Sequence, residues 1–234
     1  MNWTDKVRAA EDRIEAFRQT AEDLRKYEPQ GEDLVGGLDW SKEPDIARFE
    51  QAREMLAPNN LLARDAPTAI NELEELAARG SIASMWYLGW AFERGKVVPV
   101  NKARAEKWFR LGAEQGPLSM RRNLAAFYMN DNRFAEAKPI LELLTEQNFP
   151  PGVRMLGRMY ANGLGVERDI PKARELLERA SASGNIRAKI LLAKYWMSGK
   201  FGKKRRLRAF VLAWQATRDK DHLESVFPSS SRLL

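Results

Sequence analysis

The sequence contains no cysteine and a single histidine, His222. Without cysteine the chain can form no disulfide, no thiolate metal site and no cysteine nucleophile. One histidine cannot build a histidine-based metal cluster, and it would have to serve any catalytic triad alone. We therefore expect neither a metal nor a cofactor, and we interpret His222 as a surface or capping residue.

Long hydrophobic runs are also missing. The longest are a few residues, such as 190–193, whereas a membrane-spanning helix needs roughly 20. The first six residues are polar and do not resemble the apolar core of a signal peptide. These absences predict a cytoplasmic protein, or a periplasmic one if a leader has been removed.

Catalytic patterns are scarce as well. Neither common type of phosphate-binding glycine loop is present, and Gly163 and Gly165 fit a turn between helices better. The carboxylate pair Glu74 and Glu75 lies in polar surroundings typical of a solvated helix face rather than of an acid–base pair. The sequence therefore predicts that the protein is not an enzyme.

The residues that are present suit a folded, basic protein. Hydrophobic residues make up 44% and charged residues 30% of the chain. Lys and Arg number 39 against 32 Asp and Glu, a formal net charge of +7 at pH 7. This excess favours acidic partners, whether nucleic acid, an anionic surface or an acidic protein.

A repeat runs through most of the chain. Leucines occur at 88, 124, 156 and 192, so the repeat length is 36, 32 and 36 residues. Each leucine is followed directly by a Gly or Ala, and an aromatic residue stands three positions after that small residue. Such helix pairs cannot bury their apolar faces alone, but stacked repeats can. The small residue would allow two helices to approach closely while the aromatic fills the space one turn on.

A second helical segment follows each of these first segments. Apolar residues recur in it at helical spacing, as at Ala173, Leu176, Leu177 and Ala180. Where each pair should end, the chain has Gly80, Gly116, Asn148 and Gly184. Gly and Asn tolerate the left-handed conformation found at helix C-termini, so these positions predict the boundaries between repeats.

The segment from 156 to 173 reads LGRMYANGLGVERDIPKA and resembles the signature of Sel-one-like repeats, relatives of the tetratricopeptide repeat. Residues 81–116 are similar, 117–148 have a shorter loop, and 185–217 have basic residues where the family has Gly-Val and Asp. The resemblance implies an all-α fold, a right-handed α/α superhelical solenoid of stacked helix hairpins with an N-terminal helical extension. It also implies an adaptor or scaffold that holds a protein partner in a concave groove.

The ends differ from the repeats. Residues 4–28 predict an amphipathic helix that either caps the solenoid or pairs with a second chain. A helix is expected over 44–57, and Asp65 is expected to cap the next one. We divide the chain into an N-terminal helical extension over 1–65, a repeat solenoid over 66–220 and a flexible tail over 221–234.

Two candidate binding surfaces follow. In related solenoids the first helix of each repeat lines the groove, so positions two residues from each core leucine should face it. With Arg187 added, the predicted groove residues are Trp86, Trp90, Arg122, Arg154, Arg158, Arg187 and Lys194. Trp is a frequent binding anchor and Arg binds carboxylates with two hydrogen bonds. Alternatively, the tryptophans pack under the N-terminal helices and the arginines are only solvated.

The second surface is the basic turn of the last repeat. Its cations are Lys200, Lys203, Lys204, Arg205, Arg206 and Arg208. They could contact phosphates with strong salt dependence, or form a solvated turn that discourages further stacking.

We therefore predict a protein-binding adaptor, scaffold or inhibitor that holds an acidic segment in the groove. One alternative is a bacterial immunity-type protein that neutralises a cognate toxin. The other is a nucleic-acid or anionic-surface binder that uses the basic turn.

Overall fold

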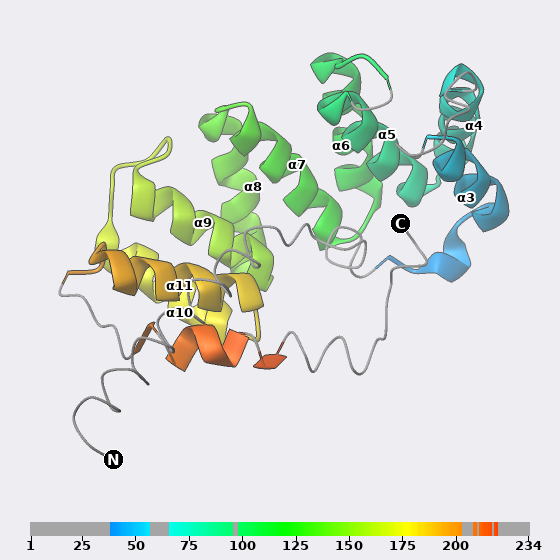
Figure 1. The fold of residues 1–234 in the computed structure, drawn as a ribbon. Helices are drawn as coiled ribbons and strands as arrows, with labels where there is room; N and C mark the ends of the chain where they lie inside the picture. The colour runs from blue at the N-terminus through cyan, green and yellow to red at the C-terminus, as the bar shows by residue number, and fades with distance from the viewer. Residues whose placement is uncertain are drawn as a thin grey trace, which may run out of the picture. The chain divides into compact units, whose positions relative to one another are not determined.

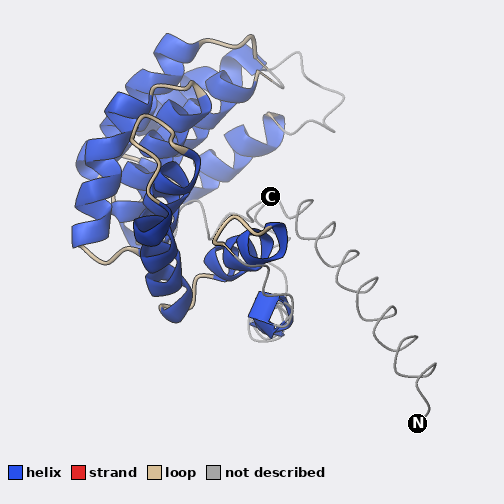
Figure 2. Cartoon of the chain, turned by 90° about the vertical axis from the view of Figure 1, so that its left-hand side faces the viewer, coloured by secondary structure: helices blue, strands red, loops and turns tan. Residues whose placement is uncertain are grey.

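In a computed structural model, the part of the chain that the structure describes is entirely helical (Figure 2). The described residues are 38–56, 66–95, 98–202, 208–209, 211–216 and 218–219. The predicted helix at 4–28, the cap at Asp65, His222 and the tail at 221–234 lie outside them. The elements are η1 (Trp40–Lys42), α3 (Ile46–Met55), α4 (Ala66–Ala78), α5 (Ile82–Arg94), α6 (Lys102–Gln115), α7 (Leu118–Asn130), α8 (Phe134–Glu146), α9 (Pro150–Asn162), α10 (Ile170–Ala182) and α11 (Ile186–Ser198).

The helices belong to two compact units, divided within the last turn of α8. In the N-terminal unit, over described residues 38–144, each helix from α3 to α6 packs against the next (Figure 1). In the C-terminal unit, over described residues 145–219, α10 packs against both α9 and α11, and helical residues follow between 208 and 219. The predicted all-α fold of stacked helix hairpins is confirmed.

Most of these helices have a polar residue at the N-cap position. The side chains of Ser81, Asn101, Asp169 and Asn185 each accept a hydrogen bond from the backbone N–H three residues on. Such a cap satisfies an N–H group that the helix itself leaves unpaired. The helix expected over 44–57 is observed as α3, shorter by two residues at each end, with Asp45 as its cap.

The predicted boundary residues differ in how they end a helix. Gly80, Gly184 and Asn148 adopt the expected left-handed conformation, with φ of 95°, 84° and 53°. Gly116 was predicted to do the same, and this is wrong, because its φ is −98° and its backbone is extended. Glycine is needed there for space, since a Cβ would lie 2.7 Å from the Gly112 carbonyl oxygen and from Met120 Cγ.

Helix hairpins close at the small residues that follow the repeat leucines. A Cβ on Gly89 would lie 2.8 Å from the Phe109 ring, and one on Gly157 would lie 3.0 Å from Leu177 Cγ. Phe109 and Leu177 belong to α6 and α10, the second helices of the two hairpins. The expected close approach at these positions is thus observed.

A cation stacks on each repeat aromatic. The cation belongs to a residue in or just before the first turn of the helix that follows. The pairs and the distances from cation to ring centroid are Arg104–Phe92 (4.0 Å), Arg133–Tyr128 (4.5 Å), Lys172–Tyr160 (4.2 Å) and Arg208–Trp196 (5.2 Å). Three of these cations also pair with a carboxylate of an earlier helix: Arg104 with Glu74 (2.6 Å), Arg133 with Glu106 (2.5 Å) and Arg208 with Glu178 (2.8 Å). We call this repeated contact the rung. In the three rungs with a carboxylate, the contact links an aromatic to the two helices beside it and favours their stacking.

The rung at Glu106 is the most connected. Its carboxylate accepts hydrogen bonds from Arg133 and from the Tyr128 hydroxyl at 2.9 Å. The Arg133 hydrogen bond holds the pKa of Glu106 below its ordinary value, while burial acts in the opposite direction. The carboxylate form is therefore preferentially stabilised in the folded protein.

Glu43 fastens the first described residues to the repeats. Its carboxylate accepts hydrogen bonds from the Ser81 hydroxyl and from the backbone N–H groups of Ile82 and Ala83, at 2.5, 3.1 and 3.2 Å. These N–H groups open α5, where a negative charge is favourable. Residues before α3 are thereby integrated into the N-terminal unit.

We predict opposite stability changes for two glycine-to-alanine substitutions. Gly89→Ala should lower the free energy of unfolding by about 1 kcal/mol, because crowding against buried Phe109 outweighs the gain in helix propensity. Gly112→Ala should raise it by about 0.5–1 kcal/mol, because its Cβ would make only ordinary contacts at 3.7 Å. Urea unfolding monitored by circular dichroism measures both. Equal effects of the two substitutions would contradict the close approach at Gly89.

We also predict acid sensitivity from the Glu106 rung. A carboxylate with a lowered folded pKa stabilises the fold above its ordinary value of 4.5, and this contribution is lost as pH falls through the folded pKa. Glu106→Gln should therefore lower the melting temperature at pH 7 and flatten its decline below pH 4.5. Glu114→Gln is the control, because Glu114 is exposed on the same helix and forms no ion pair among the described residues. If both variants keep the pH profile of the original protein, the rung does not contribute.

Candidate functional site

The positive charge is concentrated in one part of the chain. Residues 145–234 contain 18 Lys and Arg against 8 Asp and Glu, whereas residues 1–144 contain 21 against 24. The net charge of +7 thus combines +10 in the first of these segments with −3 in the second. A surface that attracts acidic groups is therefore to be sought in the C-terminal unit.

Four predicted groove residues lie on two neighbouring helices of that unit. Arg154 and Arg158 lie one turn apart on α9, and Arg187 and Lys194 lie two turns apart on α11. The two helices contact each other, and the Asn162 side chain of α9 donates a hydrogen bond of 2.9 Å to the Tyr195 hydroxyl of α11. We call these four residues the cationic face.

The cationic face lies beside the buried core positions of α9 and α11. On α9, Val153, Met155, Leu156 and Met159 are buried, whereas Arg154 and Arg158 are half-buried. On α11, Arg187 is half-buried and Lys194 is exposed. Burial lowers the pKa of the Arg158 guanidinium, and Tyr195 acts in the opposite direction. The charge of Arg158 is thus poorly solvated.

The remaining groove residues belong to the N-terminal unit. Trp86 and Trp90 are half-buried on α5 and flank Tyr87, with ring centroids 6.0 and 5.6 Å from its ring. Burial raises the pKa of Tyr87 to about 12, against a smaller opposite effect of Arg53, so this aromatic group is poorly hydrated. Arg122 on α7 is only 7% exposed. Arg122 lies two residues before Leu124 and was therefore predicted to face the groove, yet its side chain offers a partner little surface.

The predicted basic turn is only partly described. Lys203, Lys204, Arg205 and Arg206 lie outside the described residues. Arg208 belongs to a rung, where it is bound by Glu178 and Trp196. Lys200 directly follows Gly199, the left-handed residue that ends α11, and its ammonium group donates a hydrogen bond to Asn162 Oδ1. Lys200 therefore contacts α9, the helix that carries Arg154 and Arg158.

Sequence reasoning missed two residues beside Lys200. Tyr195 and Asn162 were not among the predicted site residues, yet their hydrogen bond joins the ends of α9 and α11. A contact between residues so far apart in sequence arises from helix stacking. The cation at position 200, where the preceding repeat has Leu164, was the available signal.

Searches of the described residues give no sign of a metal or membrane site. They contain no group of three or more His, Asp or Glu side chains that could hold a metal ion. None of the helices described is long and apolar enough to cross a membrane.

Comparisons with known proteins agree with this repeat architecture. The family model of the Sel1 repeat matches residues 82–117 and 150–185. No curated protein matches the sequence. Among solved structures, a Sel1 repeat protein from Oxalobacter formigenes is 21% identical, with a TM-score of 0.57 over 74% of this chain and 72% of its own.

A second similar structure is a protective antigen present in uropathogenic Escherichia coli strains, which displays an SLR fold. It is 20% identical, with a TM-score of 0.57 over 82% of this chain, which spans 44% of that protein's length. The chain therefore contains two Sel1 repeats and has the fold of Sel1-like repeat proteins.

Proposed function

We propose that this protein is an interaction scaffold that binds an acidic segment of a partner protein on the cationic face of α9 and α11. Sel1 repeat solenoids generally serve protein–protein interaction and are typically non-enzymatic. The observation that carries the proposal is the placement of these four cations, Arg154 and Arg158 on α9 and Arg187 and Lys194 on α11, on two helices in contact. The segment that holds both helices, residues 145–234, has a net charge of +10.

Half-burial favours Arg154, Arg158 and Arg187 as binding groups. Water and salt screen a fully exposed ion pair, so that it contributes little, whereas a partly buried pair is screened less. Arg154 and Arg158 lie one turn apart and are held by the packing of α9, so a partner would lose little freedom in ordering them. An extended acidic segment could place successive carboxylates along this pair and reach Arg187 and Lys194 on α11.

A protein partner is favoured over nucleic acid by what the described cations contact. Arg208, which sequence reasoning assigned to the basic turn, is engaged by Glu178 and stacked on Trp196. Nonspecific nucleic-acid binding depends on many phosphate contacts and weakens steeply with salt. Binding that survives physiological ionic strength after nuclease treatment would therefore support the protein partner.

We predict that reversing two charges of the cationic face weakens partner binding strongly. The test variant is Arg187→Glu with Lys194→Glu, and the control is Arg110→Glu with Arg174→Glu, which changes the net charge equally on exposed positions of α6 and α10. Each full-length protein would be used to capture partners from nuclease-treated lysate of the source organism, and the purified partner would then be titrated by calorimetry. The test variant should lose at least about tenfold in affinity, and the control less than about twofold.

Melting temperatures of both variants would show that folding is intact. A partner that binds the test variant and the original protein equally would contradict the assignment of the cationic face. If untreated lysate yields nucleic acid and nuclease-treated lysate yields no protein partner, the basic turn would be favoured instead.

A further inference from the structure

The ends of α9 and α11 hold a fixed arrangement of polar side chains. The Asn162 amide nitrogen donates to the Tyr195 hydroxyl at 2.9 Å and to the Arg158 carbonyl oxygen at 2.7 Å. Its amide oxygen accepts a hydrogen bond from the Lys200 ammonium group. The amide thus uses both of its ends to position one hydroxyl and one cation.

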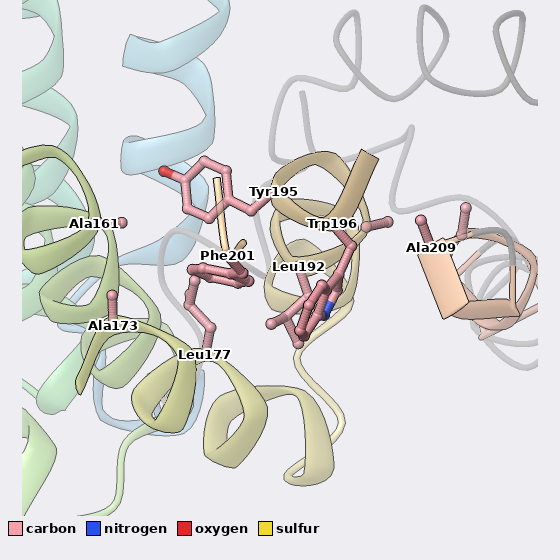
Figure 3. Packing of buried hydrophobic residues seen from close by; sticks show 10 residues of the cluster. Ala161, Ala173, Leu177, Leu192, Tyr195, Trp196, Phe201 and Ala209 are labelled. Atoms are coloured by element: carbon pink, nitrogen blue, oxygen red, sulfur yellow. The ribbon is translucent and has the colours of Figure 1, made fainter. Parts of the chain in front are cut away.

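Aromatic contacts also hold the Tyr195 and Lys200 side chains in place. Tyr195 is 6% exposed, and its ring lies edge-on to Phe201 at 5.2 Å. Figure 3 shows its hydroxyl directed towards the helix that carries Ala161, which is α9. The Lys200 nitrogen lies 4.7 Å from the centroid of the Tyr195 ring. Both donors are therefore held before any ligand arrives, which reduces the entropy cost of binding.

Lys200 and Tyr195 retain hydrogen-bond donors that Asn162 does not use. An ammonium group has three N–H donors, and Lys200 gives one of them to Asn162. The Tyr195 hydroxyl accepts from Asn162, so its own proton can be donated elsewhere. The two side chains can thus supply up to three hydrogen bonds to an oxygen ligand.

Like charges surround Lys200. Burial lowers the pKa of its ammonium group, and Arg168 and Lys194 lower it further by repulsion. Among the described residues, no carboxylate forms an ion pair with any of these three cations. Bringing cations together without an anion is unfavourable, and a bound anion would relieve the repulsion.

We propose that Lys200, Tyr195 and Asn162, flanked by Arg168 and Lys194, form a preorganised site for a carboxylate of an acidic peptide. The site deepens the proposed function, on which it rests, because it would receive one carboxylate at the end of a segment that crosses the cationic face. Lys200 and Tyr195 would donate hydrogen bonds to the ligand, and Asn162 would position both of them.

The position of the site favours a carboxylate over a phosphate. Phosphates are commonly bound at helix N-termini, by backbone N–H groups and the positive end of the helix dipole. This site lies at the C-terminal ends of two helices, each equivalent to roughly half a negative charge. The positive charges of Lys200, Arg168 and Lys194 exceed the negative charge of the two helix ends, so an anion is still attracted. The helix ends repel a singly charged carboxylate less than a phosphate dianion.

The test uses the full-length protein and a fluorescein-labelled oligoglutamate peptide, with affinity measured by fluorescence anisotropy at physiological ionic strength. Lys200→Gln should weaken binding about tenfold. The matched control Arg174→Gln removes the same charge from an exposed position of α10 and should change affinity less than about twofold. Equal losses in the two variants would show diffuse attraction to a basic protein and would overturn the site.

Two variants without a charge change sharpen the test. Tyr195→Phe removes one hydroxyl, and Asn162→Ala removes the support of Lys200. Each should weaken oligoglutamate binding by a factor on the order of three to ten while the melting temperature stays close to that of the original protein. Unchanged binding of both variants would overturn the proposed hydrogen bonds. Stronger binding of oligophosphate or of duplex DNA at the same residues would overturn the choice of carboxylate.

Failure of this site and failure of the proposed function give different results. If Lys200→Gln binds oligoglutamate normally while Arg187→Glu with Lys194→Glu loses the partner, the scaffold stands and the site is overturned. If Lys200→Gln loses oligoglutamate while the captured partner binds the double variant normally, the site stands and the partner uses another surface.

Discussion

The close approach of paired helices at Gly89 and Gly157 is the constraint on which the other features depend. A Cβ at Gly89 would overlap the Phe109 ring, and one at Gly157 would press on Leu177. Because the second helix of each hairpin covers this side of the first, the core leucines beside it are buried as well. The other side of the first helix is less completely buried. On α9 that side carries Arg154 and Arg158.

The rungs separate structural cations from those that can bind a partner. Arg104, Arg133 and Arg208 each stack on an aromatic and pair with a carboxylate of an earlier helix. Their charge is already compensated within the fold, and such partly exposed pairs contribute modestly to stability. Among the described residues Lys194 and Lys200 have no such carboxylate. Counting Lys and Arg in the sequence cannot distinguish the two groups, since the rungs form only when helices stack.

The helices and their contacts were predictable to different degrees. The spacing of Leu88, Leu124, Leu156 and Leu192 predicts the hairpins, because burial of one helix face is a local, periodic requirement. Arg122 shows where the projection fails. Its position relative to Leu124 matches that of Arg154 relative to Leu156, yet it is 7% exposed, because α7 is covered over more of its surface. Helical phase tells which way a side chain points from its axis, but not what packs there.

The proposed carboxylate site occupies a turn whose backbone geometry two repeats share. Leu164 and Lys200 both follow a left-handed glycine, and the backbone N–H of each donates at 3.0 Å to the carbonyl oxygen five residues earlier, that of Met159 or Tyr195. The turn is therefore the same in both repeats, while an apolar pair in one is replaced by a cation and a phenol in the other. Since the backbone geometry is retained, the two replacements change the chemistry of the turn without disturbing the hairpin. Residues 185–217 thus keep the repeat structure at this turn, and the cation at position 200 is what the proposed carboxylate site adds to it.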